Sequence, residues 1–392
     1  MDIYNSQPSH GGMFMRSHPP SGLKHMNPVV FLHTDHHSGE YWDTKPDGDP
    51  GWVSVFNNEG FMVYAPDLPF CGKSKGFGSA MVALGLPAMR FTPQFAEAML
   101  TAPERINHFH WMGVEHHTQW PGTGLRGDPC FEAYFRKTEV KMLGDQERQT
   151  RAQHSLVDFL NTLEHPAILV GHGSGANLAY LAADRAPERV AAIVALEPIG
   201  PPFANALRNS SRSDGTKLEY TSEYVSIPTN QPGVRCRPYG VSDIPLQFDP
   251  PPLPPTTMED ILDEGSRYQP IPFVEVFDQK AKQFCYLQDE SVHPPRKLTN
   301  LQKIPNCIFT AGSSSHSAYD WATVAFLKQA GVPVQHLELA VKNGNGPLFF
   351  LEKNSSKLAL SLINWLRGNI LSRPSLGLLN PPPSTGAAQN SS

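Results

Sequence analysis

Residues 168–180, which read ILVGHGSGANLAY, form the stretch that decides how this chain folds. The stretch begins with an apolar run typical of a buried strand and ends with apolar residues at the spacing of a helix. Between these two parts, glycines stand at positions 171, 173 and 175. Because glycine has no Cβ, it permits backbone conformations and close approaches that other residues do not. The stretch therefore predicts a strand that turns sharply into a helix.

The glycine spacing resembles the nucleophile elbow of the α/β-hydrolases, G-x-S-x-G, whose central serine is the nucleophile. Gly171 and Gly175 match the two framing glycines, so the nucleophile position falls on Gly173. In an alternative register Ser174 is the nucleophile. His172 and Ala176 would then be the framing residues, and a histidine Cβ would crowd the turn. The pattern indicates an elbow with glycine in place of serine, and Ser174 stays open as the alternative nucleophile.

The chain on both sides of this stretch alternates between short apolar runs and segments with apolar residues at helical spacing. We expect strands at residues 28–33, 61–65, 167–170, 190–196, 305–310 and 334–339. We expect helices at residues 52–58, 146–163, 175–184, 319–329 and 348–366. Such alternation is typical of an α/β fold, in which a mostly parallel, twisted sheet carries helices on both faces.

Composition divides the chain into five stretches. Residues 1–26 and 369–392 are polar and rich in small residues and proline, so we expect a flexible leader and a disordered tail. Residues 27–200 and 302–368 hold the alternating pattern and are expected to form the two parts of one core. Residues 201–301 are proline-rich and are predicted to be a cap or lid inserted into that core, with a disordered linker as the alternative.

Charge and composition exclude several classes of partner. The net charge of −5 and the absence of a basic patch argue against nucleic-acid binding, and no apolar run is long enough to span a membrane. The first residues lack the features of a secretory signal, so we expect a cytoplasmic protein. The five cysteines are scattered without C-x-x-C spacing, which favours neither disulfides nor zinc. We expect an apolar small molecule as partner and no cofactor or metal; the oligomeric state is not indicated.

Several ordered motifs resemble those of α/β-hydrolase esterases from bacteria and filamentous fungi. The signature A-L-E-P-x-G-P-P-F of these esterases is matched by residues 195–203. Further matches lie at residues 91–93, 118–124, 243–246 and 351–354. The resemblance spans about residues 27–368, and it implies an α/β-hydrolase fold with a catalytic serine, histidine and carboxylate.

The resemblance also shows where this chain departs from the catalytic pattern. It places the nucleophile at Gly173 and the acid at Glu197, with Asp320 as the fallback acid. The base of these esterases stands in a G-N-G-H segment, where this chain has Pro347, which cannot accept a proton. Their oxyanion loop, H-G-G-G-x-x-G, corresponds to residues 33–39, in which three glycines are replaced by other residues. The resemblance therefore implies a catalytically degenerate member.

The residues in the altered loop suggest a rebuilt pocket. Asp35 and His36 replace two of the loop glycines and are expected to lie near His172 and Glu197. A carboxylate beside imidazoles in a covered pocket can carry out general acid–base chemistry. The plainer interpretations are that His36 is a solvated loop residue and that Glu197 only accepts hydrogen bonds from backbone amides.

Three functions follow from these observations. The first is a non-hydrolytic enzyme, an isomerase, cyclase or lyase, that acts on an apolar small molecule through Glu197 and nearby histidines. The second is a non-catalytic protein that binds a small molecule or serves as a scaffold. The third is a residual esterase that uses Ser174. Because fungal relatives often belong to secondary-metabolite pathways, the resemblance implies such a setting.

Overall fold

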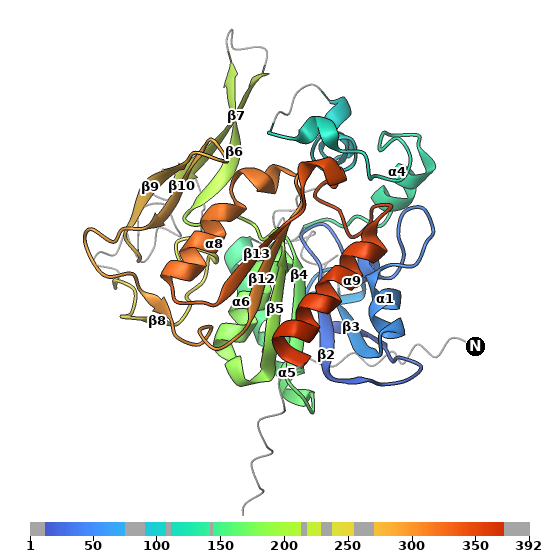
Figure 1. Cartoon of the computed structure of the whole chain (residues 1–392), viewed down its shortest axis with the longest axis horizontal. Helices are drawn as coiled ribbons and strands as arrows, with labels where there is room; N and C mark the ends of the chain where they lie inside the picture. The colour runs from blue at the N-terminus through green and yellow to red at the C-terminus, as the bar shows by residue number, and fades with distance from the viewer. Residues whose placement is uncertain are drawn as a thin grey trace, which may run out of the picture.

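The computed structural model describes residues 12–74, 91–106, 111–141, 144–212, 218–228, 237–254 and 270–371. In this part of the chain, seven strands form one sheet in the order β1-β3-β2-β4-β5-β12-β13 (Figure 1). The strands are β1 (Phe14–His18), β2 (His25–Leu32), β3 (Phe61–Asp67), β4 (Ala167–His172), β5 (Val190–Leu196), β12 (Asn306–Thr310) and β13 (Val334–Glu338). β1 pairs antiparallel with β3, whereas the other neighbours are parallel. The predicted mostly parallel sheet is confirmed.

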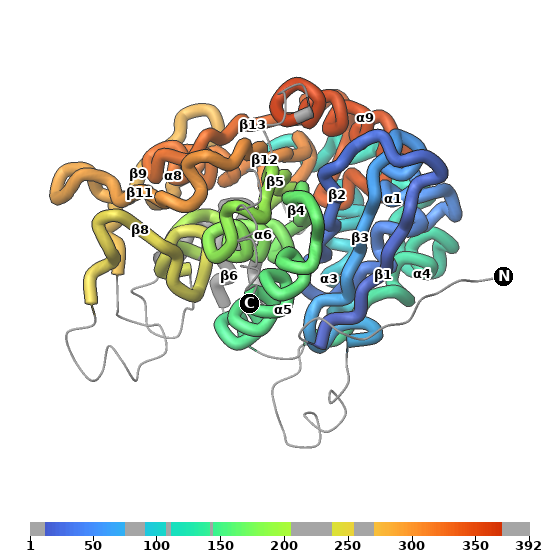
Figure 2. The backbone as a smooth tube through the Cα atoms, turned by 90° about the horizontal axis from the view of Figure 1, so that it is seen from below, coloured from blue at the N-terminus to red at the C-terminus, as the bar shows by residue number. Residues whose placement is uncertain are grey.

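Helices cover both faces of the sheet, as Figure 2 shows. One face carries α1 (Trp52–Asn58) and α9 (Ser355–Leu366), and the other carries α5 (Asp145–Thr162), α6 (Ser174–Arg185) and α8 (Asp320–Gln329). Alternate residues of β4 point to opposite faces, as the pleat of a strand requires. Ile168 and Val170 therefore pack with α1 and α9, whereas Leu169 packs with α5 and α6. The sheet is buried on both sides.

The chain between β5 and β12 is where the sequence predicts a cap. Its described part contains three antiparallel pairs, in which β6 (Ala204–Arg212) pairs with β7 (Leu218–Pro228), β8 (Phe248–Asp249) with β11 (Lys297–Leu298), and β9 (Phe273–Asp278) with β10 (Gln283–Gln288). The short helices α3 (Pro93–Ala96) and α4 (Pro129–Phe135) precede α5. Figure 1 shows the β9–β10 hairpin beside α8, at the edge of the molecule.

Two elements differ from their predicted extent. β1 lies inside the stretch expected to be a loose leader, where its backbone pairs with β3 and its Arg16 forms a buried ion pair with Asp67. Met13, just before β1, is buried against the core. The last helix begins at Ser355 instead of residue 348, because the apolar residues 348–351 are buried in turns that precede it.

The predicted turn from strand to helix lies between β4 and α6. Gly173 has φ 53° and ψ −122°, a conformation that favours glycine. A Cβ at Gly171 would lie 2.4 Å from the carbonyl oxygen of Gly175. A Cβ at Gly175 would lie 2.4 Å from the carbonyl oxygen of Leu32. The backbones of β2, β4 and α6 therefore meet at a distance that only glycine allows.

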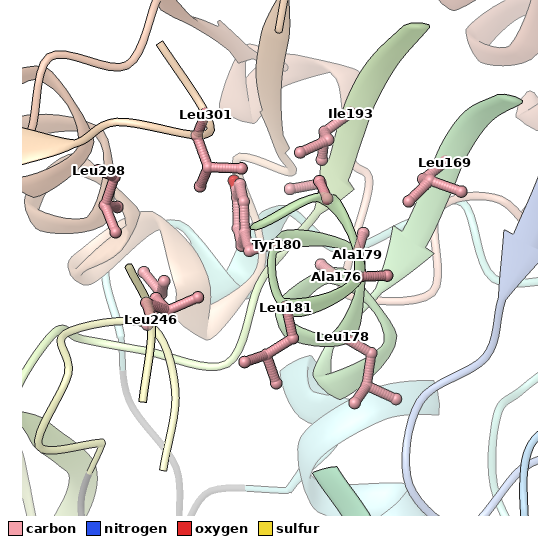
Figure 3. Close-up of a cluster of buried hydrophobic side chains, with 14 of the residues drawn as sticks. Leu169, Ala176, Leu178, Ala179, Tyr180, Leu181, Ile193, Leu246, Leu298 and Leu301 are labelled. Atoms are coloured by element: carbon pink, nitrogen blue, oxygen red, sulfur yellow. The ribbon is translucent and has the colours of Figure 1, made fainter. Parts of the chain in front are cut away.

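Burial of α6 holds this turn in place. Every residue from Ser174 to Asp184 is buried. Figure 3 shows Leu178, Tyr180 and Leu181 in one cluster with apolar side chains of β4, β5 and the segment that precedes β12. Burying one such side chain contributes about 1.5–3 kcal/mol, so the helix cannot move without losing several of these contributions. The first turn of α6 is thus presented rigidly at the carboxyl end of the sheet.

We predict that Gly175→Ala lowers the free energy of unfolding by about 2–3 kcal/mol, because its Cβ would overlap the carbonyl oxygens of Leu32 and His33. Chemical denaturation of the purified variant measures this loss. The control is Gly22→Ala, whose Cβ would meet nothing within 4 Å. Equal stability of the Gly175→Ala variant and the wild type would contradict the close approach described here.

Candidate functional site at the strand-to-helix turn

Thr34 lies against the turn at Gly173. Its Oγ1 accepts a hydrogen bond from the backbone N–H of Ser174 at 3.2 Å. A Cβ built on Gly173 would lie 2.3 Å from Thr34 Oγ1 and 2.9 Å from Thr34 Cβ. The threonine side chain therefore fills the space that a side chain at position 173 would need.

The hydroxyl of Ser174 is held by Asp35 and Arg148. It donates to Asp35 Oδ1 at 2.6 Å, accepts from the backbone N–H of Asp35 at 3.0 Å, and accepts from Arg148 Nη1 at 3.2 Å. Within the described residues, no histidine is hydrogen-bonded to this hydroxyl. Ser174 starts α6 with its side chain bound to the loop after β2.

Asp35 is a poor proton acceptor in this arrangement. Its carboxylate forms ion pairs with Arg148 and with Lys141, whose Nζ lies 3.0 Å away. Although burial opposes the effect, these two cations hold the pKa of Asp35 well below its usual range. A carboxylate with so low a pKa does not take a proton from a serine hydroxyl. Asp35 thus holds the Ser174 hydroxyl in place through two hydrogen bonds.

The backbone donors at the turn are occupied. In hydrolases with such an elbow, the oxyanion is bound by the N–H after the nucleophile and by an N–H from the loop that follows a neighbouring strand. The matching groups here are the N–H of Ser174, which donates to Thr34 Oγ1, and the N–H of Asp35, which donates to Ser174 Oγ. Both N–H groups therefore already donate hydrogen bonds to side-chain oxygens of the protein.

The two loop histidines, His36 and His37, bind backbone and phenol groups. His36 Nδ1 donates to the carbonyl oxygen of Glu139 at 3.1 Å, and its ring stacks on Phe91. His37 Nδ1 donates to the carbonyl oxygen of Asp35 at 2.7 Å, and its Nε2 accepts from Tyr134 at 3.0 Å. Burial lowers the pKa of His37 to about 3, so its imidazole is neutral. In the described structure neither ring is hydrogen-bonded to the acid at position 197.

His172 ends β4 and lies under aromatic side chains. The hydroxyl of Tyr41 donates to its Nδ1 at 3.0 Å, and the ring of Phe350 lies 4.9 Å from the imidazole. The backbone of Pro347 lies close enough to this ring to affect its pKa. Burial, together with His37 and His316, lowers the pKa of His172 well below its usual value, so the ring is neutral. The loop expected to carry a base thus reaches the turn, but it presents a proline.

Glu197 follows β5 and is fully buried. Its Oε1 accepts from the backbone N–H of Ala311 at 2.9 Å, and its Oε2 accepts from the hydroxyl of Ser314 at 2.8 Å. Burial raises the pKa of this carboxyl to about 8, despite the opposing effect of His316. The raised pKa favours the protonated carboxyl in the folded protein, and both of its oxygens have hydrogen-bond partners.

A second group of polar side chains lies next to Glu197. His316 Nδ1 is 3.2 Å from Asp320 Oδ1, and Thr310 Oγ1 donates to Asp320 Oδ2 at 2.7 Å. Although burial lowers it, Asp320 and Glu197 raise the pKa of His316 above its usual value. From the sequence, Asp320 was predicted only as a fallback acid, and His316 was not predicted at all. The spacing of four residues between them, at the start of an expected helix, is the signal that could have identified the pair.

A buried histidine holds the loop that contains Pro347. His117 Nδ1 lies 2.9 Å from Glu104 Oε2, and His117 Nε2 lies 2.8 Å from Glu352 Oε1. Glu352 also accepts from Asn345 Nδ2 and from the backbone N–H of Gly346. Although burial lowers it, the two carboxylates raise the pKa of His117 to about 9. A buried imidazolium between two carboxylates therefore anchors this loop beside the turn.

A cavity of about 1040 Å³ opens next to these groups. It is lined in part by Thr310 and Ala311 at the carboxyl end of β12, and by His336 in the middle of β13. Ala311 is also the residue whose N–H binds Glu197, so the cavity and the Glu197 site share a wall. None of the residues of the turn at Gly173 is among the lining residues of this cavity.

Two other kinds of site are absent from the described residues. No group of three or more His, Cys, Asp and Glu side chains is arranged to hold a metal ion. No helix in the described part of the chain is long and apolar enough to cross a membrane.

Comparisons with known proteins agree on one family. A family model described as "alpha/beta hydrolase fold" matches residues 27–213. The chain is 31% identical over 363 residues to "Probable secreted lipase phiG" from Fungal sp., covering 91% of this chain and 85% of that protein. Among solved structures, a novel bacterial esterase matches with a TM-score of 0.54 and 16% identity, covering 91% of this chain and 85% of that one. The esterase comparison supports the fold alone.

We predict that His117 makes stability depend on pH. Because the pKa of His117 rises from 6.5 to about 9 on folding, its contribution is complete below pH 6.5 and is lost as pH rises through 9. His117→Gln should remove about 3 kcal/mol at pH 6 and flatten this decline, as measured by urea denaturation across the pH range. The control is His116→Gln, because that neighbouring side chain is 56% exposed. An unchanged pH profile in His117→Gln would refute the assignment.

Proposed function

Because the chain belongs to the α/β hydrolase family, we propose that it binds an apolar small molecule on a hydrolase scaffold without serine-dependent acyl transfer. The observation that carries this proposal is the position of Thr34. Its side chain fills the space beside Gly173 and accepts a hydrogen bond from the backbone N–H of Ser174. Nucleophile and oxyanion donor are the two groups that acyl transfer needs at this turn.

Ser174 does not replace the missing nucleophile in this proposal. Activation of a serine needs a base near its hydroxyl, and the partner of Ser174 is Asp35, whose pKa is held low. Pro347 stands where a base is expected. In serine hydrolases, loss of the serine or of its base costs on the order of 10⁶ in turnover. Residual esterase activity through Ser174 is therefore the least supported of the three functions.

The apolar nature of the ligand rests on relatives and on the cavity. The name of the fungal relative is that of a lipase. The cavity beside Glu197 is large enough for a drug-sized molecule and includes several aromatic side chains. Both observations support an apolar small molecule as partner.

A second candidate function is acid–base catalysis, and Glu197 is the observation that favours it. A carboxyl group with a pKa of about 8 holds its proton at neutral pH and can act as a general acid. His316, whose pKa is raised, lies close enough to affect that of Glu197. Of the other proposed acid–base residues, Asp35 is bound in ion pairs, and His36 and His172 have internal hydrogen bonds. Binding without chemistry is thus the better supported of the two functions.

We predict that a fluorophosphonate probe does not label the protein, because no activated serine lies at the turn. Intact-protein mass spectrometry after incubation measures the fraction labelled. Gly173→Ser alone should also stay unlabelled, since Thr34 occupies the space and Pro347 supplies no base. Stoichiometric labelling of the wild type that Ser174→Ala abolishes would overturn the proposal and favour a residual esterase.

We predict that the titration of Glu197 makes the folded protein less stable as pH rises. The pKa of Glu197 is raised on folding from 4.5 to about 8, so the contribution of its protonated form is complete below pH 4.5 and is lost as pH rises through 8. Glu197→Gln resembles the protonated form and should remove a decline on the order of 3–5 kcal/mol over that range. Thermal and urea unfolding between pH 4.5 and 9 measure the effect. The control is Glu188→Gln, because Glu188 does not belong to this site. A decline of equal size in Glu197→Gln would contradict the prediction.

A further inference from the structure

We propose that the cavity between the β9–β10 hairpin, residues 111–115, the start of α8 and the ends of β12 and β13 binds a neutral, ring-containing alcohol or phenol. We call it the hairpin cavity. The proposal rests on the proposed function and names the ligand class. The cavity measures about 1040 Å³, at the upper end of the range of about 300–1,000 Å³ that ligand sites occupy.

The apolar lining of the hairpin cavity suits a flat ring. Phe277 and Phe284 are partners in the β9–β10 register, and their ring centroids lie 4.7 Å apart. These two rings are 40% and 50% exposed, and Met112, which also lines the cavity, is 56% exposed. Trp111 and Trp321 complete the aromatic part of the lining. Exposed apolar side chains that share one hollow mark a binding site more often than single exposed residues do.

The charged groups of the hairpin cavity disfavour an anion. Four carboxylates and two ammonium groups belong to the lining, an excess of two negative charges: Glu115, Glu275, Asp278, Glu338, Lys280 and Lys282. One of the two ammonium groups is already neutralised, because Lys280 Nζ lies 2.9 and 2.8 Å from the two carboxylate oxygens of Glu338. This ion pair also ties the turn of the hairpin to β13. A ligand carboxylate would meet repulsion in such a lining.

The side chain of His336, in the middle of β13, determines which polar group the ligand needs. His336 Nε2 lies 3.0 Å from Thr310 Oγ1, and that hydroxyl donates its proton to Asp320. Nε2 must therefore be the donor to Thr310, which leaves Nδ1 of this neutral ring as an acceptor. Burial lowers the pKa of His336, in keeping with a neutral ring. Within the described residues Nδ1 has no hydrogen-bond partner, so it can accept from a ligand hydroxyl.

Three naphthalene derivatives separate these requirements. 1-Naphthol has the ring and a donor, 1-methoxynaphthalene lacks the donor, and 1-naphthoate carries a negative charge. We measure their affinities for the full chain at neutral pH by isothermal titration calorimetry. We expect 1-naphthol to bind at least about tenfold more tightly than 1-naphthoate and several-fold more tightly than 1-methoxynaphthalene.

Substitutions in the lining test whether 1-naphthol binds in the hairpin cavity. Phe277→Ala combined with Phe284→Ala should weaken 1-naphthol at least about tenfold. The matched control is Val274→Ala, which removes an exposed apolar side chain of the same strand outside the cavity lining and should leave affinity unchanged. His336→Phe should abolish the preference for 1-naphthol over 1-methoxynaphthalene. Circular dichroism and thermal unfolding check that each variant is folded.

The results that overturn the proposal are distinct from those that overturn the proposed function. Absence of 1-naphthol binding, equal affinity for 1-naphthoate, or an unchanged affinity in the folded phenylalanine double variant would each refute the ligand class or its site. None of these affinities depends on Ser174. Labelling of Ser174 by a fluorophosphonate with intact naphthol binding would refute only the absence of acyl transfer.

Discussion

The close approach of three backbones at the turn constrains the rest of this structure. A Cβ at Gly171 would overlap α6, and a Cβ at Gly175 would overlap the carbonyl oxygens at the end of β2. Because α6 is buried along its length, it cannot shift to make room. The position of Gly173, the direction of α6 and the place of the loop after β2 are therefore coupled. Every polar group near the turn is arranged around this fixed point.

Thr34 determines how the polar groups at the turn are paired. With glycine at position 173, the space beside the turn is open to a neighbour, and the threonine side chain occupies it. Its hydroxyl then accepts a hydrogen bond from the backbone N–H of Ser174. The hydroxyl of the same serine donates a hydrogen bond to Asp35. The polar groups of the turn are satisfied by one another, which removes the penalty of burying them unpaired. The same hydrogen bonds leave no free donor for a substrate oxygen at this point.

Buried titratable side chains position two loops of this protein. His117 lies between Glu104 and Glu352 and anchors the loop of Pro347, while Glu197 binds the loop after β12 through Ala311 and Ser314. Both groups have pKa values raised by folding. A group of this kind binds its proton more tightly in the folded protein, so stability falls as pH rises. Loop position and pH dependence thus have the same physical origin.

The sequence by itself determined the α/β architecture, because apolar periodicity and glycine spacing are local signals. It also predicted the extent of α1 and β5 and the register of the turn, since only glycine fits at positions 171 and 175. Tertiary structure alone decided that Asp35 pairs with Arg148, more than a hundred residues away, and that His316 lies beside Glu197. It also decided that the hairpin cavity lies next to Glu197, with no residue of the turn in its lining. Such contacts join residues distant along the chain, and one sequence carries no local pattern that specifies them.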